Sequence, residues 1–226
     1  MVIAIKLVFI SDIHSNLEAL QEVMNKIQEI KPSEIFCLGD ICGYGANPLE
    51  TISIIKRIPC VMGNHEFAVT TDDVSWFNAF AAEAIEWTRK NITLEEMKFL
   101  SNLKHRLIVN IDGLNLYLVH GSPDDPLFTY IYEKDADVVK NLDCDVLVVG
   151  HTHIPFVKSV GKKIVINAGS VGQPRDGDPR SSFVVLDTET LEAEIVRVNY
   201  NVEEAAQKII KAGLPKFLAE RLYKGV

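Results

Sequence analysis

The 226-residue chain has the length and composition of one ample globular domain, with 47% hydrophobic and 24% charged residues. Its formal net charge of −8 argues against a general duplex-DNA or RNA surface, because such surfaces are normally basic. Tightly bound divalent cations would offset part of this charge, so the charge does not exclude phosphate-containing substrates.

The apolar run at the N-terminus is expected to be a buried strand rather than a secretion signal. Lys6 interrupts the run and Ser11-Asp12 ends it, without a small-residue cleavage site behind a basic region. No apolar stretch reaches the roughly 18 residues that a membrane helix needs. The cysteines lack Cys-x-x-Cys spacing, which predicts reduced, buried thiols in a cytoplasmic protein with no membrane partner; they are Cys37, Cys42, Cys60 and Cys144.

The first part of the chain alternates strand and helix patterns. A helical stripe of apolar residues begins at about Asn16, and a second helix is expected from Asn47-Pro48, with Asn47 as its cap and Pro48 in its first turn. Strands are predicted at residues 6–10, 34–38 and 59–62. This βαβαβ order indicates parallel strands joined by helical crossovers.

The rest of the chain is helical at first and then returns to strands. Residues 72–103 have a helical pattern, and Asp112-Gly113 is a hairpin-turn signal. A helix is expected at about 202–212. Strands are predicted at residues 106–111, 114–119, 145–149, 155–160, 163–167, 182–187 and 192–198. Because there is no repeat or linker, we expect a single domain over residues 1–226, with a possible helical cap at about 72–104.

Five of the predicted strands end in residue types that bind divalent metals, usually beside a glycine. The carboxyl ends of strands in open α/β sheets form a crevice, so these side chains should converge there. One four- to six-coordinate ion cannot use them all, and a carboxylate can bridge two cations, so two metal ions are predicted. Nitrogen and oxygen donors without thiolate suit Mn²⁺, our first expectation, as well as Fe, Zn²⁺, Co²⁺ and Ni²⁺. The candidate ligands are Asp12, His14, Asp40, Asn64, His120, His151 and His153.

Two features of this set have alternative interpretations. An extended backbone would put His151 and His153 on one face, pointing at a common object, but such a pair can also be polar residues on the wet face of a strand. His65, next to Asn64, could act as a general acid or steady the transferred group. The alternative for His65 is a purely structural histidine.

The ordered motifs resemble those of the calcineurin-like metallophosphoesterases over roughly residues 7–170. The matching stretches are Asp12-x-His14, Gly39-Asp40, Gly63-Asn64-His65-Glu66, His120-Gly121 and Gly150-His151-x-His153. The resemblance implies an α/β fold in which a two-sheet mixed β-sandwich is flanked by helices, with a dinuclear site at the strand ends. It implies attack on phosphorus by a metal-bridging hydroxide, with His65 assisting the leaving oxygen. Its two ligand sets are Asp12, His14, Asp40 and His153, and Asp40, Asn64, His120 and His151, with Asp40 bridging.

Departures from the family pattern favour the small prokaryotic phosphodiesterase branch. Serine/threonine protein phosphatases of this family have Gly-Asp-x-x-Asp-Arg-Gly and an Arg immediately before Gly-Asn-His-Glu. Here Ile-Cys-Gly43-Tyr44 follows Asp40, and Met62 stands in place of that second Arg. Both arginines that would clamp a dianionic monoester are therefore missing from those places.

We therefore expect a phosphodiesterase acting on a small nucleotide-like phosphoester or phosphoanhydride. Some members of this branch cleave dinucleotide polyphosphates. The alternatives are a phosphomonoesterase, including a serine/threonine protein phosphatase, and a non-catalytic metal-binding scaffold, as in a coat subunit of this fold with a degraded metal site. The complete ligand set argues against the scaffold. The sequence is compatible with a homo-oligomer.

Three weaker signals concern substrate binding. In the loop at residues 167–182, Arg175 or Arg180 could bind a substrate phosphate, or both could be solvated in a turn-rich loop. Asn16 could touch substrate, although capping of the first helix is the simpler expectation. An aromatic stripe could stack on a nucleobase, although burial in the core is the commoner fate of such stripes; its members are Trp76, Phe80 and Trp87.

Overall fold

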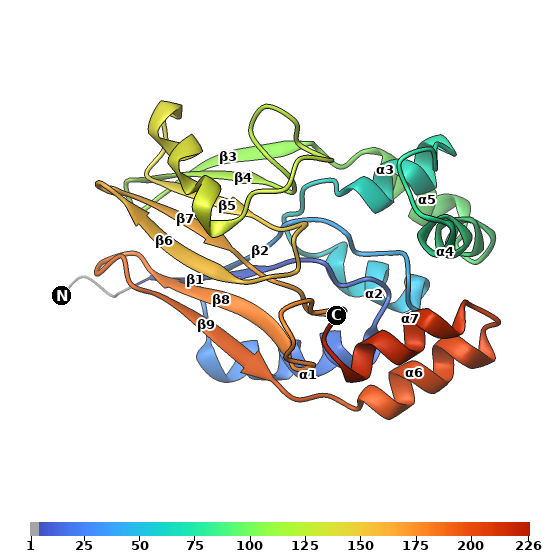
Figure 1. The fold of residues 1–226 in the computed structure, drawn as a ribbon. Coiled ribbons are helices and arrows are strands. Elements are labelled where there is room, and N and C mark those ends of the chain that lie inside the picture. Colours follow the sequence, from blue (N-terminus) through green and yellow to red (C-terminus); the bar gives the residue numbers. More distant parts are fainter. Residues whose placement is uncertain (1–4) are drawn as a thin grey trace.

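Two mixed β-sheets packed face to face form the centre of the molecule, with helices outside them (Figure 1). The computed structural model describes residues 5–226. The first sheet has the order β2-β1-β8-β9, and β1 pairs in parallel with β2 and antiparallel with β8. Its strands are β1 (Lys6–Ile10), β2 (Glu34–Cys37), β8 (Ser181–Asp187) and β9 (Ala193–Val198).

The second sheet has the order β3-β4-β5-β7-β6, in which three parallel strands are flanked by two antiparallel hairpin partners. The Asp112-Gly113 turn joins β3 to β4, as predicted. Its strands are β3 (Arg106–Ile111), β4 (Leu114–Val119), β5 (Val146–Val149), β6 (Phe156–Val160) and β7 (Lys163–Asn167). The predicted fold class, a two-sheet sandwich flanked by helices, is confirmed.

The two faces of β1 serve two different cores, because its apolar side chains alternate in direction. Leu7 and Phe9 pack in the cluster between the two sheets. Val8 and Ile10 pack on the other side with the helices α1 (Leu17–Ile30) and α2 (Pro48–Ile55). All four side chains are fully buried. Burial of each contributes about 1.5–3 kcal/mol, so β1 holds its carboxyl end in a fixed position.

Most of the remaining helices gather at the end of the molecule where β1 and its parallel neighbours terminate, whereas the 3₁₀ helix η1 (Glu133–Asn141) packs beside β6 and β7 (Figure 1). α7 packs on α6, and both share an apolar cluster with α4 and with Tyr44. Among residues 5–226, no helix is both long and apolar enough to cross a membrane. These elements are α3 (Asn64–Thr71), α4 (Ala79–Lys90), α5 (Leu94–Ser101), α6 (Val202–Lys211), α7 (Lys216–Glu220) and the 3₁₀ helices η1 (Glu133–Asn141) and η2 (Arg221–Tyr223).

Three local predictions differ from the structure. Residues 59–62 form only isolated bridges, Cys37 to Cys60 and Val61 to Lys104, because Pro59 lacks an N–H and the chain turns into α3 directly afterwards. Asn47 precedes α2, but its side chain makes no capping bond. Beyond the helix expected at about 202–212, where no further element is predicted, the chain forms α7 (Lys216–Glu220) and η2 (Arg221–Tyr223). They gain their stability from packing against other elements rather than from a pattern of their own.

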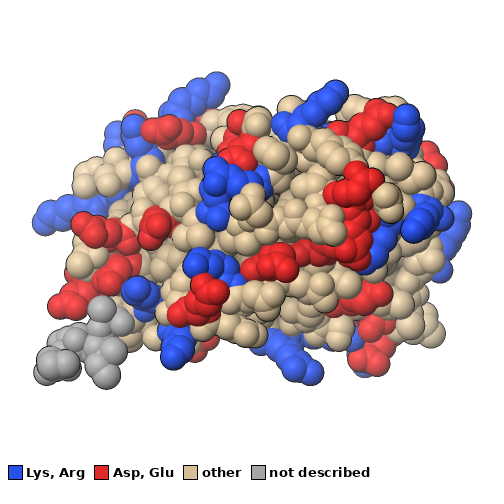
Figure 2. Space-filling view, turned by 90° about the horizontal axis from the view of Figure 1, so that it is seen from below, with Lys and Arg blue, Asp and Glu red and all other residues tan. Residues whose placement is uncertain are grey.

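Charges of both signs are interspersed on the face that carries α1, β9 and α6. Figure 2, which looks at the molecule from below relative to Figure 1, shows lysine, arginine and acidic side chains alternating between neutral areas. This face has no continuous basic band of the kind that tracks a phosphate backbone.

Candidate metal centre

The strand ends that carry the candidate ligands turn sharply into the same crevice. Most of these residues have a left-handed backbone conformation, which Asp and His tolerate better than most side chains do. The φ angle is 65° at His151 and 59° at His153, so this segment is not extended as expected, and the two rings diverge toward different partners. Positive φ angles occur at Asp12, His14, Asp40, His151 and His153.

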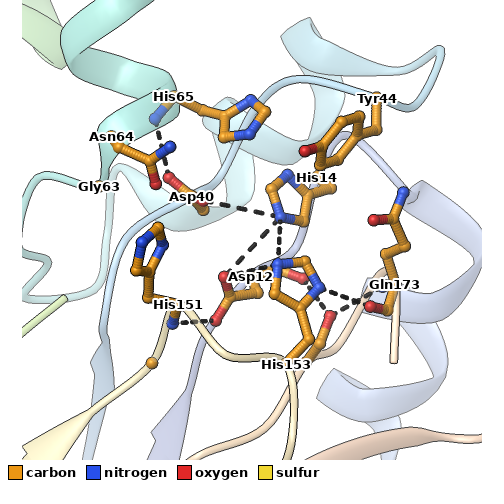
Figure 3. A network of polar contacts seen from close by, with 12 residues as sticks. Asp12, His14, Asp40, Tyr44, Gly63, Asn64, His65, His151, His153 and Gln173 are labelled. Carbon is orange, nitrogen blue, oxygen red and sulfur yellow. Dashed lines mark hydrogen bonds and ion pairs between the residues drawn. The ribbon is translucent and has the colours of Figure 1, made fainter. Parts of the chain in front are cut away.

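One group of candidate ligands surrounds the buried carboxylate of Asp12 (Figure 3). His153 Nε2 lies 3.2 Å from Asp12 Oδ1 and 3.2 Å from His14 Nε2. His14 Nε2 is 3.7 Å from Asp12 Oδ1 and from Asp40 Oδ2. These four side chains offer two carboxylate oxygens and two imidazole nitrogens to one point.

A second group shares Asp40 with the first. His120 Nε2 lies 3.4 Å from Asp40 Oδ2, 3.1 Å from the amide oxygen of Asn64 and 3.1 Å from His151 Nδ1. The donors of Asp40, His120 and His151 all lie within 4.8 Å of one another. The structure therefore brings all seven sequence-predicted ligands into two adjoining groups with one carboxylate in common.

The outer nitrogens of the four histidines fix which ring nitrogen faces inward. Each outer N–H donates to a backbone carbonyl, so the inward nitrogen of a neutral ring carries a lone pair. The inward lone pairs of His14 and His153, and of His120 and His151, then face each other across 3.2 and 3.1 Å, which favours a cation between them. The outer partners are Cys42 O at 3.1 Å for His14, Leu38 O at 2.7 Å for His120, Gln173 O at 2.5 Å for His153 and Phe128 O at 3.2 Å for His151.

In each aspartate, one carboxylate oxygen accepts a hydrogen bond from a backbone N–H and the other faces the histidine rings. Asp12 Oδ2 accepts from the His151 N–H and Asp40 Oδ1 accepts from the His65 N–H, both at 3.0 Å. Asp12 Oδ1 is buried and has no hydrogen-bond partner among residues 5–226. An orphaned buried carboxylate oxygen among imidazole lone pairs is costly unless a cation is bound, so the donor set fits two divalent metal ions.

The charges in the metal-free centre are set by burial and by Asp40. Burial opposes ionisation of Asp40, but the positive histidines, His120 foremost, outweigh it and hold its pKa well below the usual range. Burial likewise opposes protonation of His120, but Asp40 outweighs it and raises the pKa of His120 to about 10. Burial, assisted by His120, lowers the pKa of His151 to about 4, and burial and Arg175 lower that of His153.

These values predict that metal binding displaces the proton of His120. At pH 6–8 His120 is protonated in the metal-free protein, whereas His151 and His153 are already neutral. Metal affinity should therefore rise about tenfold per pH unit over this range. Calorimetric titration of Mn²⁺ into stripped protein, in buffers of different ionisation enthalpy, measures both the affinity and the released proton. An affinity that does not change with pH would contradict this assignment.

Glu66 holds the loop that presents Asp40. Its Oε2 accepts from the N–H groups of Asp40 at 2.7 Å and Gly63 at 3.0 Å. Its Oε1 accepts from Ile41 N at 2.8 Å and Cys42 N at 3.1 Å. Gly63 is required here, because a Cβ at this position would lie 2.1 Å from Asp40 Oδ1. The buried carboxylate thus replaces a missing strand partner for the backbone of this loop.

Glu66→Gln is expected to destabilise the fold and to weaken metal binding. One end of the amide cannot accept, so two buried N–H groups lose their partner, at about 3 kcal/mol in total. Urea unfolding and metal analysis measure the two effects, with the exposed Glu22→Gln as the matched control. If Glu66→Gln unfolds at the same urea concentration as Glu22→Gln, the loop does not depend on this carboxylate.

His65 stands beside the two groups without belonging to either. Its ring packs edge-on against His14 at 4.7 Å, Tyr44 at 4.6 Å and Phe77 at 5.0 Å between centroids. Gly43 makes room for it, since a Cβ there would lie 2.2 Å from His65 Nδ1. Burial lowers the pKa of His65 well below its usual value against the opposing effect of Asp40, and the proximity of His14 and Arg175 adds to the lowering. In the metal-free protein the ring is therefore neutral at physiological pH.

A pocket of about 370 Å³ opens onto these residues. Its floor contains Asp40, Asn64, His151 and His153, and His65 lines its side. Sequence reasoning did not single out several of its wall residues, because they come from distant segments and no local pattern marks them. They are Tyr44, Phe77, Phe128, Tyr130, Phe217 and Arg221.

The predicted substrate-binding residues have different places. Arg175 lines the pocket, and its buried Nε has no hydrogen-bond partner. Arg180 is exposed, forms an ion pair with Asp178 at 2.7 Å and does not line the pocket. Asn16 caps α1, accepting from Ala19 N and donating to Gly172 O, so both ends of its amide are already bonded.

The aromatic stripe is less buried than expected. Trp76 is 74% exposed, lines the pocket and lies 5.6 Å from the Phe128 ring. Phe80 is 46% exposed and stacks on Phe217. Trp87 alone packs at the edge of a core cluster. The core interpretation is therefore wrong for Trp76 and Phe80: Trp76 lies before α4 begins, and both contact partners at the pocket side of the molecule.

The chain is similar to known proteins over most of its length. Residues 5–191 match the family model of the calcineurin-like phosphoesterase superfamily domain. An uncharacterized protein of Methanocaldococcus jannaschii, MJ0912, is 43% identical, with 96% of each chain covered. Phosphodiesterase YfcE of Escherichia coli K12 is 27% identical, with 82% of this chain and 89% of YfcE covered.

A solved structure shares the whole fold. The metallophosphoesterase from Sphaerobacter thermophilus superimposes with a TM-score of 0.87 at 32% identity, covering 99% of this chain and 100% of the other. Members of this family depend on dinuclear metal centres, in keeping with the two adjoining ligand groups. The chain belongs to the calcineurin-like phosphoesterase superfamily.

Proposed function

We propose that this protein is a dinuclear metal-dependent phosphodiesterase that hydrolyses a small nucleotide-like phosphoester or phosphoanhydride. The observation that carries the proposal is the pair of ligand groups sharing the buried Asp40, beside a histidine that no metal group uses. Mn²⁺ is the ion we expect, and the mixed nitrogen and oxygen donors also suit Fe, Zn²⁺, Co²⁺ and Ni²⁺.

The proposed roles of the side chains follow from their positions. When bound, two divalent cations activate water and neutralise charge on the phosphoryl oxygens. Asp12, His14 and His153 would hold one of them, and Asn64, His120 and His151 the other, with Asp40 shared. The side chain of His65 makes no hydrogen bond within residues 5–226 and lines the pocket, so its ring is available to hydrogen-bond an oxygen of the transferred group.

The surroundings of the pocket favour a diester over a monoester. Met62 and the residues after Asp40 provide no arginine pair for a dianionic phosphate. Of the two arginines that line the pocket, Arg175 is the one that contacts Tyr44 beside His14 and His65. The single guanidinium group near the ligand groups matches the single charge of a diester. Trp76, with Phe128 beneath it, offers an exposed aromatic surface of the kind on which a nucleobase stacks. A volume of about 370 Å³ is within the range for small-molecule ligands.

The proposal is tested by comparing two simple esters. Metal-stripped protein reloaded with Mn²⁺ should hydrolyse bis-p-nitrophenyl phosphate at least about tenfold faster than p-nitrophenyl phosphate, judged by kcat/KM, because one guanidinium group balances the diester better than the monoester dianion. A preference for the monoester would support a phosphomonoesterase instead. Two bound metals without hydrolysis of either ester, or of a panel of nucleotides, would support the scaffold.

A further inference from the structure

The outer wall of the pocket comes from the C-terminal segment, α7 and η2, which lies beyond the part of the chain that matches the family model. Phe217 and Arg221 of this segment line the pocket. Phe217 stacks on Phe80, with ring centroids 5.0 Å apart. Leu218 and Leu222 are buried in the same cluster as Tyr44. Packing therefore fixes the segment against the pocket.

Arg221 and Arg175 both line this pocket, and neither pairs with an Asp or Glu side chain among residues 5–226. Arg89, Arg180 and Arg197, by contrast, each pair with an aspartate. The Arg221 guanidinium lies 5.4 Å from the centre of the Phe217 ring, and its Nε donates to the carbonyl oxygen of Val226. Its two terminal nitrogens make no hydrogen bond to residues 5–226. An anionic ligand in this pocket would therefore find the terminal nitrogens of Arg221 without a hydrogen-bond partner among residues 5–226.

The two guanidinium groups line the same pocket as Asp40 and His65 but contact different neighbours. The Tyr44 ring is 4.6 Å from the His14 ring and 4.6 Å from the His65 ring. Arg175 contacts Tyr44 on its other side, with Nη2 3.4 Å from the hydroxyl oxygen. Burial and, after it, the charge of Arg175 lower the pKa of Arg221 to about 10. Arg221 lies against Phe217 of α7, and no hydrogen bond joins it to a candidate metal ligand within residues 5–226.

We propose that Arg221 binds a second phosphate of the substrate, one that is not cleaved. The preferred substrates are then nucleotides with at least two adjacent phosphates, in which one phosphate lies at the ligand groups and its neighbour at Arg221. Which bond is cleaved rests on the proposed function, but the binding of the second phosphate does not. The C-terminal segment would thus determine specificity within a site whose metal ligands come from elsewhere in the chain.

Calorimetric binding of two non-hydrolysed probes tests this subsite. Mn²⁺-loaded wild-type protein should bind α,β-methylene-ADP about tenfold to a hundredfold more tightly than AMP, because the second phosphate gains charge-assisted hydrogen bonds. Arg221→Gln should reduce that ratio to about one to threefold, and Arg221→Lys should restore part of it. Lys224→Ala removes an exposed positive charge three residues away, outside the pocket, and should leave the ratio unchanged.

Two results would overturn the subsite. Equal affinities of the wild-type protein for the two probes would show that no second phosphate is recognised. An unchanged ratio in Arg221→Gln, with its thermal unfolding matching that of Lys224→Ala, would show that another group is responsible. If instead no ester is hydrolysed but the ratio behaves as expected, the proposed phosphodiesterase fails and the subsite stands. If bis-p-nitrophenyl phosphate is hydrolysed but the two probes bind with equal affinity, the proposed phosphodiesterase stands and the subsite fails.

Discussion

Asp40→Asn is expected to reduce the metal content from two ions per chain to one or none and to lower turnover by about a thousandfold or more. Asp40 is the only residue that belongs to both Asp/His groups of the described chain, and its Oδ2 faces both of them. Asparagine keeps the shape but supplies no negative charge to bridge two cations. Loss of several kcal/mol of charge stabilisation in the transition state corresponds to this factor in rate.

The measurement combines metal analysis by mass spectrometry with bis-p-nitrophenyl phosphate hydrolysis. Asp143→Asn, an exposed aspartate away from the pocket, is the matched control and should retain both metals and turnover. Circular dichroism verifies that Asp40→Asn is folded. If Asp40→Asn keeps two ions and turns over the diester at the wild-type rate, Asp40 is not the shared ligand.

His65→Gln is expected to retain both metal ions while kcat for the diester falls about a hundredfold to ten-thousandfold. The ring of His65 lines the pocket, whereas only its backbone N–H, which the variant keeps, contacts Asp40. His65→Gln should therefore lose catalysis while it keeps metal binding, whereas Asp40→Asn should lose both. Stopped-flow or steady-state turnover with matched metal analysis measures this separation.

A purely structural His65 would have a different signature. The ring packs against Tyr44 and Phe77, so its removal would then lower the unfolding temperature and any loss of turnover would follow the loss of folded protein. Phe77→Leu disturbs the same packing without removing an imidazole and is the control for this effect. Turnover in His65→Gln within about threefold of Phe77→Leu would assign His65 to the structural role.

The sequence predicted the fold and the convergence of the candidate ligands because both depend on strand patterns. Apolar runs such as residues 6–10 and 145–149 end in Asp, His and Gly, and parallel strands end at one edge of a sheet. The local backbone was not predictable in the same way. His151 and His153 were expected on an extended segment, but tight turning around Asp12 imposes left-handed conformations on both.

The pocket walls escaped prediction because they depend on contacts between distant parts of the chain. Arg221 has no motif around it, and only the packing of Leu222 and Leu218 beside Tyr44 brings it to the pocket. Arg180, by contrast, was a candidate for substrate binding because of its place in the loop at residues 167–182, but it forms an ion pair with Asp178, two residues away. Trp76 was expected in the core from helical spacing, yet it precedes α4 and faces the pocket.

The most direct test of the dinuclear centre is a crystal structure of Mn²⁺-loaded protein with anomalous scattering recorded at the manganese edge. We predict two anomalous peaks about 3.5–4 Å apart, with Asp40 between them, His14 and His153 on one and His120 and His151 on the other. A single peak at one ligand group, or peaks away from Asp40, would contradict a dinuclear site and with it the proposed chemistry.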